Sequence, residues 1–439
     1  MKRALCFLAL LPSLVALPAR GEQRTLTLDQ AVQLAWAHQP DILRAKANTA
    51  AADARADEQR SSLLPQVNSS AGYTRQTANF AAQPGSTPSG VVQVGGGTFD
   101  TVSYWRLGIT ASQLVWDFNA TMDRYRSARL TAGSTQDSEL TQASATLLAV
   151  RSTYFAAHAN KALVTVAQDS VASNQAHLAQ TEAFVKAGTR PEIDLAQNRA
   201  DLANAQLQLV NAQNNYAQSK AQLNQAMGVE QSIDYEVADE SLPALPEEDA
   251  GDERLVQAAL ETRPEMKSLT KQVGAQSELI RAARGTYWPS LGVSAGVTDV
   301  GSDLRSLTWN WNAQATLSWS IYQGGLTRAQ VREAEANRAA ADAQLLGERN
   351  QIRLEVVQAR LAVTAGKASV ETSATVLENQ RTRLRLAEGR YQAGVGSIIE
   401  LQDAQVAVTN AQGQVVQASF NLSVARAQLL KALGRLPSS

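Results

Sequence analysis

Residues 307–322 read LTWNWNAQATLSWSIY, and their side chains alternate between apolar and polar for sixteen positions. This period of two is typical of a β-strand with two different faces. At about 3.3 Å per residue the stretch would extend for roughly 50 Å, which is more than a tilted transmembrane strand of about 9–11 residues needs. Tryptophans lie near both ends of the apolar face, as rings do at membrane interfaces, and the other face is small and uncharged. An exposed sheet of a water-soluble sandwich shows the same alternation.

The composition and the start of the chain indicate an exported protein. The 439 residues include 40 Lys plus Arg and 41 Asp plus Glu, and this balance argues against a nucleic-acid-binding protein. Residues 1–21 have the pattern of a secretory signal peptide, with cleavage expected before Glu22. The single cysteine, Cys6, lies within it, so we expect neither a disulfide nor a lipid-bearing thiol in the mature chain. Since no later run of about 18 apolar residues follows, a mature chain that crosses a membrane must do so as a closed barrel.

Short blocks recur at constant offsets and indicate a tandem duplication. Residues 40–42 (PDI) match residues 264–266 (PEM) at an offset of 224, whereas residues 187–188 (AG) match residues 393–394 (AG) at an offset of 206. The difference of 18 residues falls in the Gly/Ser/Pro-rich segment 77–102, which is longer than its counterpart in the second copy. Each copy therefore contains two strands joined by a loop, long in the first copy and short in the second.

The duplication predicts the domain organisation of the whole chain. A signal peptide (1–21) precedes a first structural repeat (22–228), which contains a β-hairpin (66–117) and a helical hairpin (120–227). An acidic linker (229–254) leads to a second structural repeat (255–434), which contains a β-hairpin (291–322) and a helical hairpin (326–433). A C-terminal tail (435–439) ends the chain. The apolar positions keep the same parity in both β-hairpins. Because a one-residue slip would turn each face inside out, the same face is needed in both copies.

The helical segments are long. Residues 120–187 and 326–393 show helical patterns without proline, and each is followed by a short turn with glycine and a return helix. Near these turns the apolar positions repeat every seven residues, which predicts left-handed supercoiling with knobs-into-holes packing. An ordinary antiparallel helical hairpin fits the pattern equally well. The helix that leads into each first strand and the return helix together are almost as long as the long helix, so two short helices can line one long helix.

Four strands are too few to close a barrel, because known transmembrane barrels begin at about eight strands. Unpaired strand edges are not tolerated in lipid, so copies of the chain must share one barrel in a closed ring. Two, three or four copies would supply eight, twelve or sixteen strands. The residues by themselves leave these three possibilities open.

Three motifs carry a family resemblance that covers essentially the whole mature chain. They are residues 26–31 (LTLDQA) with Pro40, residues 288–291 (WPSL), and residues 391–394 (YQAG) followed by Glu400-Leu401. In this order, and with the duplication, they resemble the TolC-type outer-membrane efflux protein family. The resemblance implies a mostly α fold with four strands per chain, in which a homotrimer builds a twelve-stranded transmembrane β-barrel and a long α-helical coiled-coil barrel.

The resemblance also implies a function and partners. The trimer would be a channel in the outer membrane of a Gram-negative bacterium, in contact with outer-membrane lipid and with its helical tunnel in the periplasm. It would passively conduct substrates delivered by a periplasmic adaptor protein and an inner-membrane pump. A duct for proteins in a type I secretion system is an alternative within the same class, because the cargo, whether drug, metal ion or protein, is chosen largely by the pump. An exported coiled-coil structural protein is the alternative from another class, but it leaves the paired strands unexplained.

Particular residues acquire expected roles from the resemblance. Adaptor contact is expected at the two turns, at Ala187, Gly188, Thr189, Ala393, Gly394 and Val395, and both glycines also fit helix C-terminal caps. A periplasmic constriction is expected from Asp194, Glu400, Asp403, Tyr391 and Arg190, and the carboxylates of the three acidic residues would favour cations when repeated around a threefold axis. Membrane-interface aromatic residues are expected at Trp105, Trp309, Trp311 and Trp319.

Structural roles are also open to the constriction residues. Ser397 and Glu400 fit a capping box, and Asp194 fits the first turn of a helix. Some family members carry an arginine where this chain has Gly396, while Arg190 stands at the equivalent place in the first repeat. This exchange predicts that Arg190 pairs with an acid of the neighbouring tip.

The sequence contains no motif that indicates catalysis, metal binding or phosphate binding. The three histidines, His38, His158 and His177, are too scattered for a metal site, and residues 95–97 (GGG) lack the lysine of a phosphate-binding loop. No nucleophile motif accompanies the serines. We therefore expect no enzyme, no cofactor and no metal. The acidic linker is expected either to wrap the waist of the tunnel, as the resemblance implies, or to be a solvated run of charges.

Overall fold

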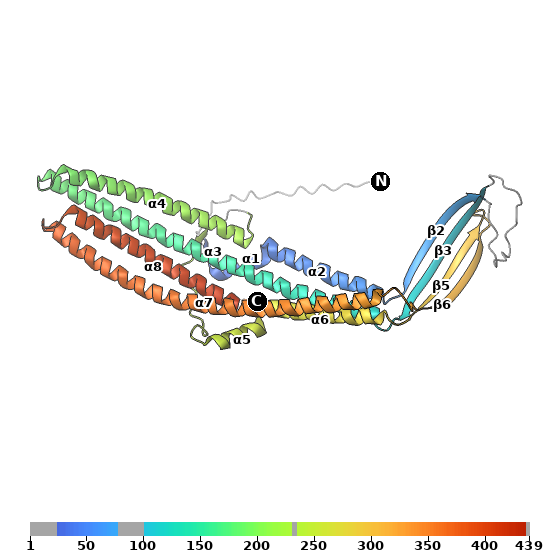
Figure 1. Ribbon diagram of the computed structural model, residues 1–439. Coiled ribbons are helices and arrows are strands. Elements are labelled where there is room, and N and C mark those ends of the chain that lie inside the picture. The colour runs from blue at the N-terminus through green and yellow to red at the C-terminus, as the bar shows by residue number, and fades with distance from the viewer. Residues whose placement is uncertain (1–23, 78–100, 231–234, 436–439) are drawn as a thin grey trace, which may run out of the picture. The chain divides into compact units, whose positions relative to one another are not determined.

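Figure 1 shows the computed structural model, which describes residues 24–77, 101–230 and 235–435. The predicted signal peptide, nearly all of the long 77–102 loop with its three glycines, and most of the predicted tail lie outside these residues. The described chain forms two compact units. The tip unit comprises the described residues up to Gln39 together with Leu147–Ala244 and Thr364–Ala427, and the sheet unit comprises Pro40–Thr146, Leu245–Val363 and the described residues from Gln428 onward.

The same series of elements occurs twice along the chain. The first series is α1 (Leu28–His38), α2 (Pro40–Ser61), β2 (Gln66–Thr77), β3 (Thr101–Trp116), α3 (Ala120–Lys186) and α4 (Glu192–Met227). The second is α5 (Asp252–Thr262), α6 (Pro264–Gly285), β5 (Ser290–Gly301), β6 (Thr308–Ser318), α7 (Leu326–Gln392) and α8 (Ile398–Ala432). Corresponding helices agree in length, with 22 residues in both α2 and α6 and 67 in both α3 and α7, as a duplication requires.

Four of the strands form one antiparallel sheet in the order β2-β3-β5-β6, and Figure 1 shows them side by side. Ala111 lies opposite both Val67 and Ala295, and Ala295 lies opposite Ala313, so these four side chains form one row across the sheet. In both hairpins, the alternating sequence pattern assigns these four positions to the apolar face. Both repeats therefore contribute their apolar faces to the same side of the sheet.

The last strand is shorter than the alternating sequence suggests. We predicted a strand through Tyr322, but β6 ends at Ser318, opposite Ser290 of β5. The residue before Ser290 is Pro289, which has no N–H group to extend the ladder. Trp319 leaves the sheet, and its indole N–H donates to the carbonyl oxygen of Tyr287 at 3.1 Å.

Each return from sheet to helix uses a left-handed turn. In the second repeat Gly324 and Gly325 have φ of 60° and 86°, and in the first repeat the matching Phe118 and Asn119 have φ of 54° and 67°. A bulky residue in this region of φ is strained by about 1–2 kcal/mol. The Phe118 ring stacks on Trp288 with centroids 5.3 Å apart, and this contact offsets the strain.

The predicted acidic linker contains regular structure. Its residues Tyr235–Val237 form β4, which pairs in parallel with β1 (Arg24–Leu26) in the tip unit. In the sheet unit, Glu248 is buried at 3% exposure and accepts a hydrogen bond from the backbone N–H of Leu245. The interpretation of the whole linker as a solvated run of charges is therefore wrong, because part of it is fixed by backbone pairing and burial.

In the tip unit the long helices pack through the predicted seven-residue repeat. All of the following repeat positions are buried or half-buried: Val164, Val171, Leu178 and Val185 of α3, Leu195, Leu202, Leu209, Tyr216 and Leu223 of α4, Val370, Leu377, Leu384 and Tyr391 of α7, and Leu401, Val408, Val415 and Leu422 of α8. The last repeat position of α8, Leu429, belongs to the sheet unit and is buried too. The repeat therefore marks the side of each helix that faces its neighbours.

Two glycines of the tip unit allow a prediction about the end of α4. Gly228 and Gly188 share a φ of about 70°, but a Cβ at Gly228 would lie 2.6 Å from Gln39 Cα, whereas a Cβ at Gly188 would meet nothing within 4 Å. Gly188→Ala should cost about 1 kcal/mol, and Gly228→Ala about 2–4 kcal/mol, since a steric clash adds to the backbone strain. Thermal unfolding of the two variants tests this order. Equal losses of stability would show that the α1–α4 contact at Gln39 is not tightly packed.

Candidate functional site: an open sheet and two helical turns

One face of the sheet is apolar and exposed. Nine of its large side chains are 40–70% exposed, and they are Val67, Tyr73, Ile109, Trp116, Val293, Val297, Trp309, Trp311 and Leu317. Moving nine such half-exposed side chains out of water is worth on the order of 10 kcal/mol. This is as large as the whole stability of an ordinary domain, so the face requires apolar surroundings.

The opposite face of the sheet is polar. Asn68, Ser70, Thr110, Ser294 and Asn312 are typical of it, and they occupy the registers between the apolar rows. Gly108 and Gly296 also lie on this face, and neither has a side chain that projects from the sheet. An apolar face and a small polar face on the same strands are the pattern of a wall between hydrocarbon and water.

Aromatic rings gather at both ends of the strands. At the end near the loops, Trp309 and Trp311 are 66% and 70% exposed on the apolar face, and Trp105 packs on Tyr73 with centroids 4.7 Å apart. Trp319 lies beyond β6, at the end where the strands join the helices. Trp116, Phe118 and Trp288 form a second aromatic cluster at that end, and none of the three was predicted as a membrane-interface residue.

Both edges of the sheet are open within the described chain. β2 and β6 each have one neighbouring strand, and alternation of direction across β2-β3-β5-β6 makes these two edge strands antiparallel to each other. A β6 edge can therefore continue into the β2 edge of a second copy with the same antiparallel pattern. The strands have 11–16 residues, which is long enough to span a membrane when tilted.

The turns that join α3 to α4 and α7 to α8 have the same local structure. Gly188 and Gly394 adopt φ of 72° and 77°. The backbone N–H of Thr189 donates to Phe184 O at 3.0 Å, and that of Val395 donates to Arg390 O at 3.1 Å, which are the six-to-one bonds of a Schellman cap. The expected capping role of both glycines is thus present. Ala187, Thr189, Ala393 and Val395 are exposed beside them.

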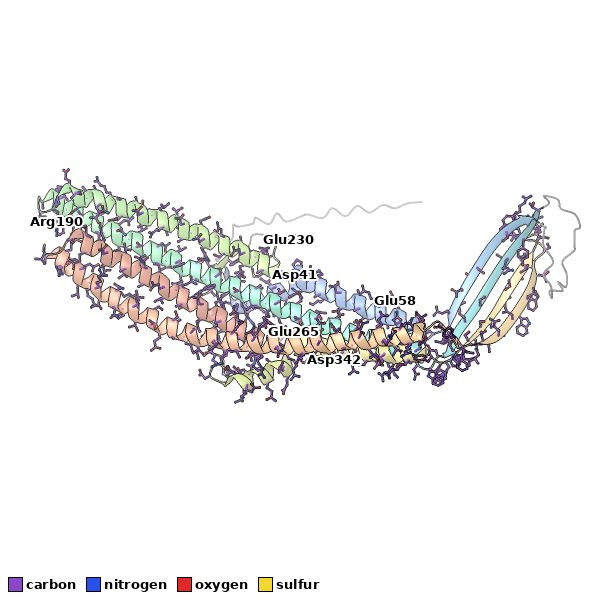
Figure 2. All side chains as sticks on the ribbon, viewed as in Figure 1. Asp41, Glu58, Arg190, Glu230, Glu265 and Asp342 are labelled. Atoms are coloured by element: carbon purple, nitrogen blue, oxygen red, sulfur yellow. The ribbon has the colours of Figure 1, made fainter. Side chains whose placement is uncertain are left out.

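Arg190 links the two turns within one chain, and Figure 2 shows it at the α3–α4 turn. Its guanidinium carbon lies 4.5 Å from the centroid of the Tyr391 ring, and Nη2 donates to the carbonyl oxygens of Tyr391 and Gly396 at 3.3 Å. A Cβ at residue 396 would lie 2.9 Å from Tyr391 N, so glycine is needed there. The pairing of Arg190 with an acid of the neighbouring tip stays a prediction.

The expected constriction carboxylates differ in their accessibility. Asp194 is only 7% exposed, in the first turn of α4, so it presents little charge to water in the single chain. Glu400 is half-buried, and its carboxylate lies 3.6 Å from the guanidinium of Arg390. Its backbone N–H donates to Ser397 Oγ at 3.1 Å. Asp403 is exposed. Tyr391 is buried, and its hydroxyl lies 3.4 Å from Thr181 Oγ1.

Two isoleucines that lie beside the turns, in addition to the predicted Val395, were not predicted. Ile193 and Ile399 occupy matching positions at the starts of α4 and α8 and are 73% and 65% exposed, and Val395 is 72% exposed. The offset of 206 residues relates the two isoleucines, so the duplication could have revealed them. Exposed apolar residues at a chain turn are a surface suited to contact with another protein.

A polar groove of about 330 Å³ in the tip unit is lined by α3, α4 and α8. Nε2 of His177 is buried there without a hydrogen-bond partner. Burial lowers the pKa of His177, and the carboxylate of Glu388 opposes this effect only partly. Burial raises the pKa of Asp201, although Gln197 and Gln402 donate to its carboxylate.

Two other kinds of feature are not found among the described residues. None of the helices is apolar over a sufficient length to cross a membrane. Among the same residues, no three His, Cys, Asp or Glu side chains are grouped so that they could hold a metal ion.

The comparison with known families matches the chain to outer membrane efflux proteins over residues 31–229 and 255–435, which is both repeats. The chain belongs to the outer membrane efflux protein family. Membership confirms the predicted family, the mostly α fold with four strands and the location in the outer membrane of Gram-negative bacteria.

Individual members of the outer membrane efflux protein family are distant in sequence. The solvent efflux pump outer membrane protein SrpC of Pseudomonas putida is 26% identical over 290 residues, which are 65% of this chain and 61% of SrpC. The outer membrane protein TolC of Escherichia coli (strain K12) is 24% identical over 455 residues, covering 97% of this chain and 86% of TolC. The solved structure of VceC from Vibrio cholerae has the same fold, with a TM-score of 0.79 at 17% identity over 93% of this chain and 96% of VceC.

The buried His177 predicts a pH dependence of stability in this efflux protein. Because its pKa is lowered in the folded state, the unfolded chain binds the proton more readily, and stability falls as the pH drops below the ordinary value of 6.5. His177→Gln should show a smaller fall in thermal stability from about pH 7.5 to about pH 5.5. His38→Gln, at an exposed position, is the control, and Asp201 is common to all three proteins. Parallel pH profiles of the wild type and His177→Gln would refute the prediction.

Proposed function

We propose that this outer membrane efflux protein is one subunit of a trimeric channel that passively conducts substrates through the outer membrane, as the exit duct of a tripartite efflux system. The open four-stranded sheet with an exposed apolar face carries the proposal. In hydrocarbon every unpaired backbone group costs several kcal/mol, so β2 and β6 must find partners on other copies.

Three copies joined edge to edge build a ring of twelve strands. Each β6 pairs with the β2 of the next copy, and the antiparallel order continues around the ring without interruption. Such a head-to-tail contact closes only as a cycle. Three is the number implied by the resemblance to TolC-type proteins. The apolar faces then meet lipid and outer-membrane interfaces, and the polar faces line a water-filled lumen.

The helical turns are the proposed docking surface for a periplasmic adaptor protein, and through it for an inner-membrane pump. The exposed residues at the turns are Ala187, Gly188, Thr189, Ala393, Gly394 and Val395, and Ile193 and Ile399 add apolar area beside them. Their repetition on both hairpins would give a trimer six similar contact points. SrpC, a solvent efflux pump protein by name, is a relative consistent with this role.

The constriction of the channel is proposed to lie at the same turns. Asp403 and Glu400 supply accessible carboxylates, and Tyr391 with Arg190 fixes the distance between the two hairpins of a chain. Asp194 acts only when the turns separate and expose it. Threefold repetition of these charges favours cations at the entrance.

The channel itself is proposed to have no catalytic activity, since the pump supplies the driving force. A duct for proteins of a type I secretion system would use the same wall and turns, so the partner rather than this chain selects the cargo. An exported structural coiled coil, by contrast, has no use for an apolar sheet face of nine exposed large side chains. Crosslinking from the turns, followed by identification of the captured adaptor, would distinguish the two duct functions.

Purified in detergent, the protein should be a trimer that conducts ions in planar lipid bilayers. Ile109→Lys and Thr110→Lys test the assignment of the two faces on neighbouring residues of β3. A lysine on the lipid-facing side costs about 2–4 kcal/mol in the membrane, so Ile109→Lys should strongly reduce the yield of inserted trimer, whereas Thr110→Lys should not. A stable monomer that does not conduct would disprove the proposed function, and equal yields would disprove the assignment of the faces.

Arg190→Ala should raise the time-averaged conductance of a single channel. Loss of the cation–π contact and of two hydrogen bonds removes about 1–2 kcal/mol of coupling between the turns, which changes the ratio of closed to open channels by about tenfold. Arg190→Lys, which keeps the charge but loses the planar guanidinium, should lie between wild type and Arg190→Ala. If conductance is unchanged in Arg190→Ala, the turns are not held closed by this residue.

A further inference from the structure

The polar face of the sheet carries one charged side chain among its described strand residues, Arg106 of β3. The register assigns Arg106 to the row of Gly72, Val300 and Thr308, whose neighbours on this face are neutral. The other charged residues in the four strands of this sheet, Arg75 and Asp299, fall in apolar rows, opposite Ser103 and Leu107 respectively. Arg106 is therefore a single charge on an otherwise neutral wall.

The surroundings of Arg106 leave its guanidinium accessible. Gly72 lies directly opposite on β2, and a Cβ there would meet nothing within 4 Å. Within the described residues Arg106 contacts Tyr104: Nη2 donates to the Tyr104 hydroxyl at 3.0 Å, and the guanidinium carbon lies 5.5 Å from the ring centroid. A tyrosine orients the group but does not neutralise it. The side chain is exposed, so its positive charge faces open space.

We propose that Arg106 forms a ring of three fixed positive charges inside the strand-lined lumen and that this ring binds small anions bearing carboxylate or phosphate groups. The inference rests on the proposed trimer, because a single sheet has no lumen. Guanidinium groups suit these anions because their planar donors match two oxygens at once. The strand-lined part of the channel would then favour anions.

The dimensions of the barrel determine whether three charges act together. Twelve strands spaced about 4.8 Å apart and tilted by about 40° enclose a backbone diameter of about 24 Å. Long side chains that project inward from three points approach one another to about the Debye length, which is about 10 Å at 0.1 M salt and about 3 Å at 1 M. The fields of the three groups therefore overlap at low salt and separate at high salt.

Arg106 lies near the loop end of the sheet. It stands five residues after Thr101, where β3 begins, and ten residues before Trp116, where β3 ends. In its row, Val300 is the penultimate residue of β5 and Thr308 is the first residue of β6. The ring therefore lies inside the hydrogen-bonded sheet, close to the loop end of the barrel.

Reversal potentials of the channel in a KCl gradient test the proposal. Arg106→Gln should lower the chloride-to-potassium permeability ratio by about twofold at 0.1 M salt, and the difference should vanish at 1 M. Arg106→Glu should lower the ratio further. Arg75→Gln removes the same charge from the neighbouring strand but from the apolar face, so it should leave the ratio unchanged.

Inorganic tripolyphosphate provides a second measurement on the unmodified protein. It should reduce the wild-type current at 0.1 M salt but not at 1 M, and this test stands even if an Arg106 variant does not assemble. Conduction without block at 0.1 M, an unchanged ratio in Arg106→Gln, or an equal change in Arg75→Gln would overturn the inference. If the wild type forms no channel at all, the proposed function fails, which is a distinct result.

Discussion

The structure depends on one constraint, that a strand edge inside a membrane must have a partner. The chain makes four strands and leaves β2 and β6 open, so no single copy can satisfy its own backbone. The exposed apolar side chains also require partners outside the single chain. The free energy gained by moving them from water into lipid is about as large as the whole stability of a typical domain. Insertion and assembly are therefore coupled: neither the apolar face nor the edges are satisfied until copies join.

Duplication explains how one chain supplies such a wall economically. Two hairpins with matched register extend one face across four strands, and two helical hairpins of 67-residue long helices end in the same Schellman-capped turn. The two copies use different residues in the left-handed turn that leads from the sheet into the long helix. Gly324 and Gly325 adopt the left-handed turn without strain, whereas Phe118 and Asn119 adopt it under strain that is offset by stacking on Trp288.

Much of this architecture could be predicted from the sequence. The period of the apolar positions reflects the local backbone geometry, and the constant offset between matching blocks reveals the duplication. Alternation predicted the strands and their common face, and the seven-residue repeat predicted the buried sides of the helices. The predicted end of the last strand, at Tyr322, was wrong because the alternation continues past Ser318, whereas the ladder with β5 stops at Ser290, directly after Pro289. The β1–β4 pair joins residues more than 200 apart with three residues each, a length that carries no periodic signal. The burial of Asp194 and the contact of Arg190 with Tyr391 are products of packing between hairpins, which spacing along one helix cannot reveal.

The distribution of charge fits a passive conduit better than a binding protein. A wall of Ser, Thr, Asn and Gln offers hydrogen bonds that water already provides, so a solute gains little by staying. Conduction requires such weak binding, because a site that holds its ligand firmly also slows its exit. Charges are accordingly sparse: one arginine on the polar face of the sheet, and accessible acids at the helical turns. Sparse charges bias which ions pass without capturing them. This leaves the choice of cargo to the proteins that load the channel.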